Sequence, residues 1–97
     1  MTAFLLADVS TDDMDGYKAS GYLDAVPKIA TLFGGVYRVR GGAMEVLEGD
    51  WQPKRMVVIE FPTMEDLKAF YESDEYLPFK QIRQGITVSK IVAVEGL

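Results

Sequence analysis

The side chains of this 97-residue chain that could do chemistry are arginines, tyrosines and carboxylates, because the sequence has no histidine and no cysteine. Arg55 and Arg83 each present a planar guanidinium fork that matches a carboxylate, so together they could clamp an acidic ligand. The alternative is structural, because each arginine could simply neutralise a neighbouring acid such as Glu48 or Glu60. Both interpretations are open for both arginines.

Aromatic side chains could complete such a ligand site. Tyr17, Tyr22 and Tyr76 could place phenolic donors at a pocket mouth, although aromatic residues at helical spacing more often lie in a core with a hydrated tip. Trp51, the single tryptophan, lies in a polar loop. It could cover a pocket or lie at the edge of a dimer interface, and we favour the interface.

Glu60 is a carboxylate within an otherwise apolar strand-like run, MVVIEF. If buried, its pKa would be raised and it could act as a general base. The alternative is an ion pair with Arg55 or Arg83, or exposure at the strand end, and Asp8 has the same ambiguity. No catalytic residue is assigned. The candidate ligand-binding residues are Tyr17, Trp51, Arg55, Glu60, Tyr76 and Arg83.

Composition and charge exclude several classes of function. A net charge of −5 without any run of Lys or Arg argues against nucleic-acid binding. The absence of histidine and cysteine removes catalytic triads, thiol nucleophiles and the commonest metal ligands, so we expect no metal and no cofactor. No segment reaches the roughly 20 apolar residues of a membrane span, and no basic signal-peptide region begins the chain, so a cytoplasmic location is expected.

The elements that must position the candidate residues can be read along the chain. Ala3 to Val9 is an apolar run of strand length, and Ser10 to Asp15 supplies N-cap candidates for a helix. Apolar spacing from Tyr17 to Phe33 predicts one helix with a break, Pro27 opening its second part. Gly34-Gly35 should end this helix, since glycine adopts positive φ without steric cost.

A hairpin is predicted next. Gly41-Gly42 suits a two-residue turn, which would pair Arg40 with Ala43, Val39 with Met44, Arg38 with Glu45 and Tyr37 with Val46. That register puts Tyr37, Val39, Met44 and Val46 on one face and joins Arg38 to Glu45 on the other. The turn also explains the two glycines better than a phosphate cradle does, because no strand–loop–helix phosphate motif surrounds them.

The remaining segments complete an α+β pattern. Met56 to Phe61 reads as a strand, Thr63 to Asp66 resembles a capping box, and Ser73-Asp74 could cap a short turn that runs through Arg83 and stops at Gly85. Ile86 to Glu95 is the last strand. The order strand–helix–strand–strand–helix–strand predicts one ferredoxin-like βαββαβ domain over 1–97, an antiparallel sheet with its helices on one face.

Two strands, MVVIEF and IVAVE, are apolar on both faces, and the predicted helices cover only one face of the sheet. The simplest cover for the second face is another copy of the chain. We therefore expect a homodimer that pairs through its sheet faces.

Several segments resemble the domain-of-unknown-function family 1330 over nearly the whole chain: FGGVYRVRGG, EVLEGDW, RMVVIEFP, the region of Tyr76 with Arg83, and VAVEG. The resemblance implies a dimeric α+β barrel, which agrees with the burial argument. It implies no reaction, because the family has no established activity, and fold-level analogy does not decide function.

Two hypotheses of function follow. In the first, the protein binds or transforms a small acidic or aromatic metabolite without a metal. In the second, it is a non-catalytic dimeric module whose charge pairs and aromatic residues serve assembly. A pocket with two convergent arginines and a buried carboxylate would favour the first, and an interior filled by side chains would favour the second.

Overall fold

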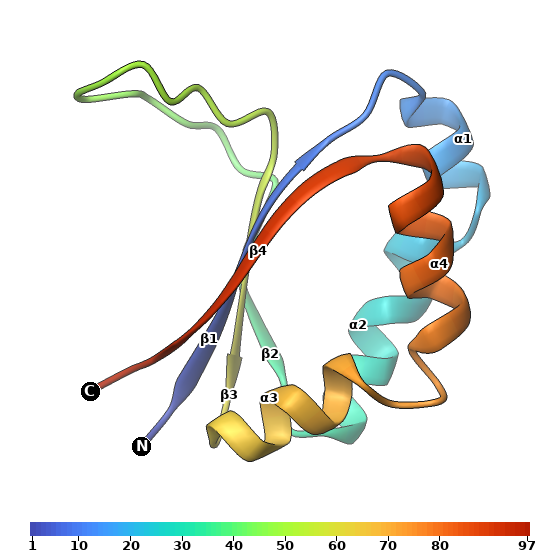
Figure 1. The fold of residues 1–97 in the computed structure, drawn as a ribbon, viewed down its shortest axis with the longest axis vertical. Helices are drawn as coiled ribbons and strands as arrows, with labels where there is room; N and C mark the ends of the chain where they lie inside the picture. The colour runs from blue at the N-terminus through green and yellow to red at the C-terminus, as the bar shows by residue number, and fades with distance from the viewer.

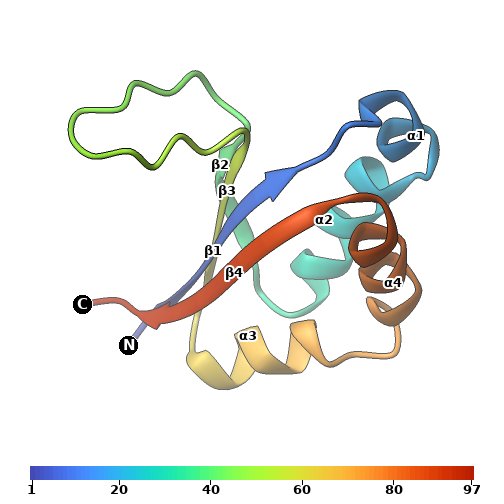
Figure 2. The same ribbon diagram turned by 45° about the horizontal axis from the view of Figure 1, so that its top comes forward.

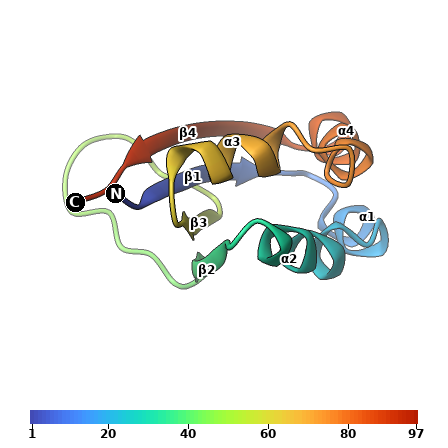
Figure 3. The ribbon, with the colours of Figure 1, turned by 90° about the horizontal axis from the view of Figure 1, so that it is seen from below.

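A computed structural model describes residues 1–97 as a four-stranded antiparallel sheet with its helices on one face (Figure 1). The strands follow the spatial order β2-β3-β1-β4, which runs from bottom to top in Figure 3. This is the expected ferredoxin-like α+β arrangement. No helix is both long and apolar enough to cross a membrane. The elements in chain order are β1 (Ala3–Ser10), α1 (Met14–Ala19), α2 (Tyr22–Leu32), β2 (Val36–Arg40), β3 (Met56–Phe61), α3 (Met64–Tyr71), α4 (Leu77–Ile86) and β4 (Val88–Glu95).

The alternation of β1 separates the two faces of the sheet. Ala3, Leu5, Ala7 and Val9 are buried against the helices, whereas the residues between them are half-buried on the other face. Phe61 and Ile59 of β3 pair with Ala3 and Leu5 and join the same core. We call the side without helices the open face.

The first helical region departs from the prediction at Pro27. The break lies at Gly21, whose φ of 84° suits glycine, and α2 then runs through Pro27 without a new start. A proline cannot donate a backbone hydrogen bond to the carbonyl four residues earlier, which is that of Leu23. In this structure Arg40 donates to the Leu23 carbonyl instead. That contact explains how the helix interior tolerates Pro27. As predicted, the helix stops before Gly34.

The second helical region is confirmed at its start and wrong at its end. The Thr63 hydroxyl accepts from the backbone N–H of Asp66 at 3.1 Å, which is the first bond of a capping box. The Asp66 carboxylate accepts from the Thr63 hydroxyl at 3.0 Å rather than from the Thr63 backbone N–H. Helix α4 continues through Gly85 to Ile86, so Gly85 is no stop and the last strand begins at Val88. Thr87 ends the helix with an extended backbone.

The predicted two-residue hairpin is wrong. Gly41 does adopt a positive φ of 69°, but β2 pairs with β3, so that Tyr37 faces Ile59 and Arg40 faces Val57. Residues 41–55, which we call the arm, contain no strand and project from one end of the sheet, away from the helices (Figures 1 and 2). β2 is an edge strand of the sheet, and residues 43–46 add no ladder to its free edge.

Candidate functional site

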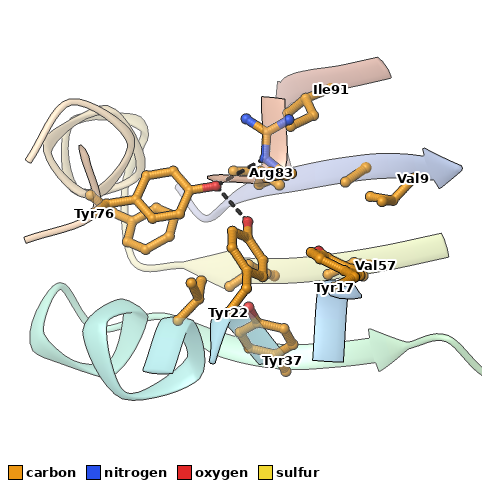
Figure 4. Close-up of a pocket in the computed structure, with 13 residues that line it drawn as sticks. Val9, Tyr17, Tyr22, Tyr37, Val57, Tyr76, Arg83 and Ile91 are labelled. Carbon is orange, nitrogen blue, oxygen red and sulfur yellow. Dashed lines mark hydrogen bonds between the residues drawn. The ribbon is translucent and has the colours of Figure 1, made fainter. Parts of the chain in front are cut away.

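A small cavity lies between the sheet and the helices, and Figure 4 shows the residues around it. Its volume is about 30 Å³. Since one water molecule needs roughly 10–15 Å³ measured in this way, the cavity has room for about two waters or for the two oxygens of a carboxylate. Almost all of its wall is hydrophobic. The lining residues with polar side-chain atoms are Tyr17, Tyr22, Tyr37, Tyr76 and Arg83.

The polar centre of the cavity is built by three side chains from two helices (Figure 4). The hydroxyls of Tyr22 and Tyr76 lie 2.6 Å apart, and Arg83 Nε donates to the Tyr76 hydroxyl at 3.3 Å. Tyr22 is the first residue of α2. Tyr76 is the N-cap of α4, and Arg83 lies seven residues later, about two turns along the same helix face. All three side chains are buried.

The groups at this centre have more donors than partners. Arg83 Nη2 is buried without a hydrogen-bond partner. The two phenols share one hydrogen bond, so one of their two protons is left without an acceptor in the protein. No carboxylate lines the cavity. The single salt bridge of the structure, between Arg38 and Glu60, lies elsewhere. The site is therefore a buried cation without an anion.

Burial governs protonation around the cavity. Burial raises the pKa of Tyr17 to about 12 and also raises the pKa values of Tyr22 and Tyr37, so all three phenols are neutral near pH 7. Burial acts to lower the pKa of Arg83, but the electrostatic interaction and the hydrogen bond with nearby Tyr76 act in the opposite direction and the net change is upward. Arg83 is therefore charged, which is costly for a buried group without a counter-ion.

Aromatic packing holds the phenols in place. Tyr76 stacks on Phe70 with ring centroids 4.6 Å apart, and its edge meets Tyr22 at 6.2 Å. Tyr22 packs in turn against Tyr17 at 5.2 Å. These contacts connect α1, α2 and α3 around the start of α4, so the donors are fixed before any ligand arrives.

One family model, described as a domain of unknown function (DUF1330), matches residues 2–97. The chain belongs to this family. The resemblance in the sequence is thereby confirmed. No curated protein matches the chain.

Solved structures place this DUF1330 chain among ferredoxin-like proteins. A protein of unknown function from Rhodopseudomonas palustris, RPA0582, superposes with a TM-score of 0.74 at 18% identity, over 99% of this chain and 82% of that one. A dimeric protein of unknown function with a ferredoxin-like fold from Bacteroides fragilis gives 0.63 at 13%, over 98% and 96%. SnoaB, a cofactor-independent oxygenase from Streptomyces nogalater, gives 0.59 at 8%, over 99% and 92%. At such identities the likeness shows the fold alone.

The structure brings together only half of the candidate residues. Tyr17, Tyr76 and Arg83 line the cavity. Arg55 precedes β3 with its guanidinium against Gly41, and it does not line the cavity. The two other candidates lie on the open face of the sheet.

Glu60 and Trp51 have partners that the sequence did not indicate. Glu60 accepts from Arg38 at 3.1 Å, an ion pair other than the two expected for it. Trp51 donates its indole N–H to Asp8 at 2.9 Å and borders a shallow apolar hollow on the open face. Neither side chain can therefore act on a ligand at Arg83 of the same chain.

Two of the five polar residues of the cavity wall, Tyr22 and Tyr37, were not among the six candidates. Tyr22 was recognised as a phenolic donor, but nothing in the sequence pairs it with Tyr76, because 54 residues separate them. Tyr37 was assigned to a core face of the mispredicted hairpin. The alternation in VYRVR was the available signal, because it places Tyr37 on the same side of the sheet as Ile59, its partner in β3.

Proposed function

We propose that this DUF1330 protein binds a small acidic metabolite whose carboxylate occupies the cavity beside Arg83. The observation that carries the proposal is the buried Arg83 Nη2, a charged donor without a partner in a cavity that no carboxylate lines. An uncompensated buried charge destabilises a protein, so it is retained where a ligand supplies the opposite charge.

The cavity matches the head of such a ligand. A carboxylate could accept from Arg83 Nη2 and from the free phenolic proton of the Tyr22–Tyr76 pair. Charge-assisted hydrogen bonds of this kind are the strong ones in proteins. The volume of about 30 Å³ accepts only the acid group, so the body of the molecule must lie outside the cavity.

We propose further that the protein acts as a homodimer through its open face. This face carries exposed apolar side chains, among them Val36, Val92 and Val94, without any helix to cover them. It also carries both signs of charge, since Asp8 and Lys90 are cross-strand partners there. Exposed apolar surface with mixed charge suits a second copy of the same face. The dimeric Bacteroides fragilis protein supports the proposal through its shared fold.

The alternative function is a dimeric module that binds no small molecule. The observation in its favour is the interior, which side chains fill except for about 30 Å³. In that case the tyrosines and Arg83 would only hold the helices together.

Isothermal titration with acetate, propionate and benzoate, in a buffer free of other carboxylates, separates the two functions. We expect at least one of these acids to bind the wild-type protein and binding to weaken at least tenfold in Arg83→Lys, because an ammonium lacks the guanidinium fork. Arg38→Lys is the matched control and should bind as the wild type does, because Arg38 lies on the open face. Equal binding by wild type and Arg83→Lys, or no binding by either, would leave the module as the better account.

A further inference from the structure

A polar cleft of about 310 Å³ lies beside the cavity, between the end of α4 and the start of β4. Arg83 and Ile91 belong to the walls of both, so an acid held at Arg83 has this cleft next to it. The volume is at the lower end of the range for small-molecule sites, roughly 300–1,000 Å³. The other residues that line the cleft are Tyr71, Gln84, Thr87 and Ser89.

Two hydroxyl groups of the cleft, those of Thr87 and Ser89, have a fixed direction of donation. Thr87 Oγ1 donates to the Arg83 carbonyl at 2.6 Å, which uses its single proton. Thr87 Oγ1 and Ser89 Oγ lie 2.7 Å apart, so the proton between them must come from Ser89. Ser89 then has no proton left to donate. Its oxygen presents only acceptor lone pairs to the cleft.

We infer that the acid bound at Arg83 is a hydroxycarboxylate whose hydroxyl group donates a hydrogen bond to Ser89 Oγ. The inference rests on the proposed function and names the class of its ligand. A hydroxyl supplies the donor that Ser89 lacks. A keto group at the same place would set an acceptor against an acceptor, and a plain alkyl chain would remove water from Ser89 without replacing its hydrogen bond.

An ammonium group is the other common donor, and the charges of the cleft disfavour it. No carboxylate lines the cleft, and Arg83 is part of its wall. An ammonium held there would find no carboxylate of the protein to pair with, because the acid group of the ligand is already bound to Arg83. Gln84 and the phenol of Tyr71 can both donate and accept, so they add affinity without selecting between a hydroxyl and a keto group.

Two matched trios of acids test the inference by titration calorimetry on the intact protein. The first compares lactate with propionate and pyruvate, and the second compares 3-hydroxybutyrate with butyrate and acetoacetate. The trios cover two positions of the hydroxyl relative to the acid group. In at least one trio, the hydroxy acid should bind about three- to tenfold more tightly than its deoxy partner, the size of one hydrogen bond, and the keto acid should bind most weakly.

Ser89→Ala should abolish this preference, because the oxygen that accepts from the hydroxyl is gone. Propionate and butyrate should still bind, and no more weakly than to the wild type, because Arg83 still holds their acid group and no serine oxygen is left without a hydrogen bond. The matched control is Ser10→Ala, which removes a serine hydroxyl from the neighbouring strand β1, on the open face of the sheet. This variant should keep the preference of the wild type.

The outcomes separate the inference from the proposed function. Acids that bind through Arg83 but show no preference for the hydroxyl, or a preference that survives Ser89→Ala, overturn the hydroxycarboxylate and leave acid binding intact. A keto acid that binds more tightly than its hydroxy partner in both trios overturns it too. If none of the six acids binds but acetate or benzoate does, the hydroxycarboxylate is overturned and acid binding is left intact. If none of these eight acids binds, both proposals fall.

Discussion

The two faces of the sheet differ in whether their charged side chains have partners. On the open face, where water would screen a lone charge, Arg38 pairs with Glu60 at 3.1 Å and the Trp51 indole N–H meets the carboxylate of Asp8. On the helix-covered face, where a lone charge is expensive, Arg83 is buried with Nη2 unpartnered. Stability alone would favour the reverse arrangement. An anion bound on the covered face, as proposed above, would account for this difference by supplying the charge that Arg83 lacks.

The largest effect that could break this comparison is expected on the open face. Val92→Asp puts a charge at the centre of the proposed interface, because Val92 lies opposite Leu6 in the neighbouring strand. We expect the dissociation constant of the dimer to rise at least a hundredfold, which is about 3 kcal/mol, because the charge would be buried without a partner. Light scattering across a dilution series would measure the change.

The fold itself should survive this substitution, because Val92 is exposed in the single chain. Ala69→Asp, a similar substitution at an exposed site of α3, should remain dimeric. A Val92→Asp protein that is still dimeric at micromolar concentration would show that the open face is not the dimer interface.

The covered face should be sensitive to alkali. An unfolded tyrosine loses its proton near pH 10, but burial raises the pKa of Tyr17 to about 12 and raises those of Tyr22 and Tyr37 as well. Above pH 10 the unfolded state therefore holds fewer protons than the folded state, and the free energy of unfolding falls as pH rises. Between pH 10 and 12, tyrosinate absorbance should rise together with loss of the circular dichroism of the fold. Ionisation of every tyrosine near pH 10 without unfolding would contradict the buried phenols.

Removing the buried charge should separate stability from binding. Arg83→Met loses one hydrogen bond to Tyr76 but also removes an unpaired cation, so the free energy of unfolding should change by no more than about 1 kcal/mol in either direction. Acid binding should disappear in the same variant. Urea unfolding measures the first quantity and calorimetry the second. A loss of about 3–5 kcal/mol would show that Arg83 already has a compensating partner in the folded protein.

The smallest effect concerns the exposed ion pair. A double-mutant cycle with Arg38→Ala and Glu60→Ala should give a coupling energy of about 0.2–1 kcal/mol when the Val92→Asp chain is monomeric, because the Arg38 side chain is half exposed. In the dimer the same coupling should be larger, since a partner would exclude water from the pair. Equal coupling in both states would place the pair outside the interface.

The fold could be predicted because local signals agreed with it. The apolar run at Met56–Phe61, the cap at Thr63 and the glycine at Gly34 each define an element without help from distant residues. The hairpin prediction failed because Gly41-Gly42 indicates only that the chain can turn there, not which segment pairs with β2. The partner of β2 was decided by the burial of β3 between β1 and β2, which is a long-range effect.

The candidate site was predicted by residue type but not by arrangement. Tyr17, Tyr76 and Arg83 were chosen for what their side chains can donate, and the structure brings them together. The sequence alone could not exclude Glu60 from the candidate site, because the side of the sheet that it faces depends on the register with β1. The ion pair of Glu60 with Arg38 could not be predicted, because it depends on the pairing of β2 with β3, which the sequence analysis missed.

Arg40 connects the wall of the cavity with the start of the arm. It donates to the Leu23 carbonyl that Pro27 leaves free, its guanidinium lies 5.7 Å from the ring centre of Tyr37 in the cavity wall, and the arm begins at the next residue. The arm reaches the open face where the Trp51 indole N–H meets the carboxylate of Asp8, so the segment from Arg40 to Trp51 runs from the cavity wall to the proposed interface. If the acid raises the affinity between the two copies by some factor, dimer formation must raise the affinity for the acid by the same factor. Calorimetry with the acid on the wild type and on Val92→Asp would measure this factor.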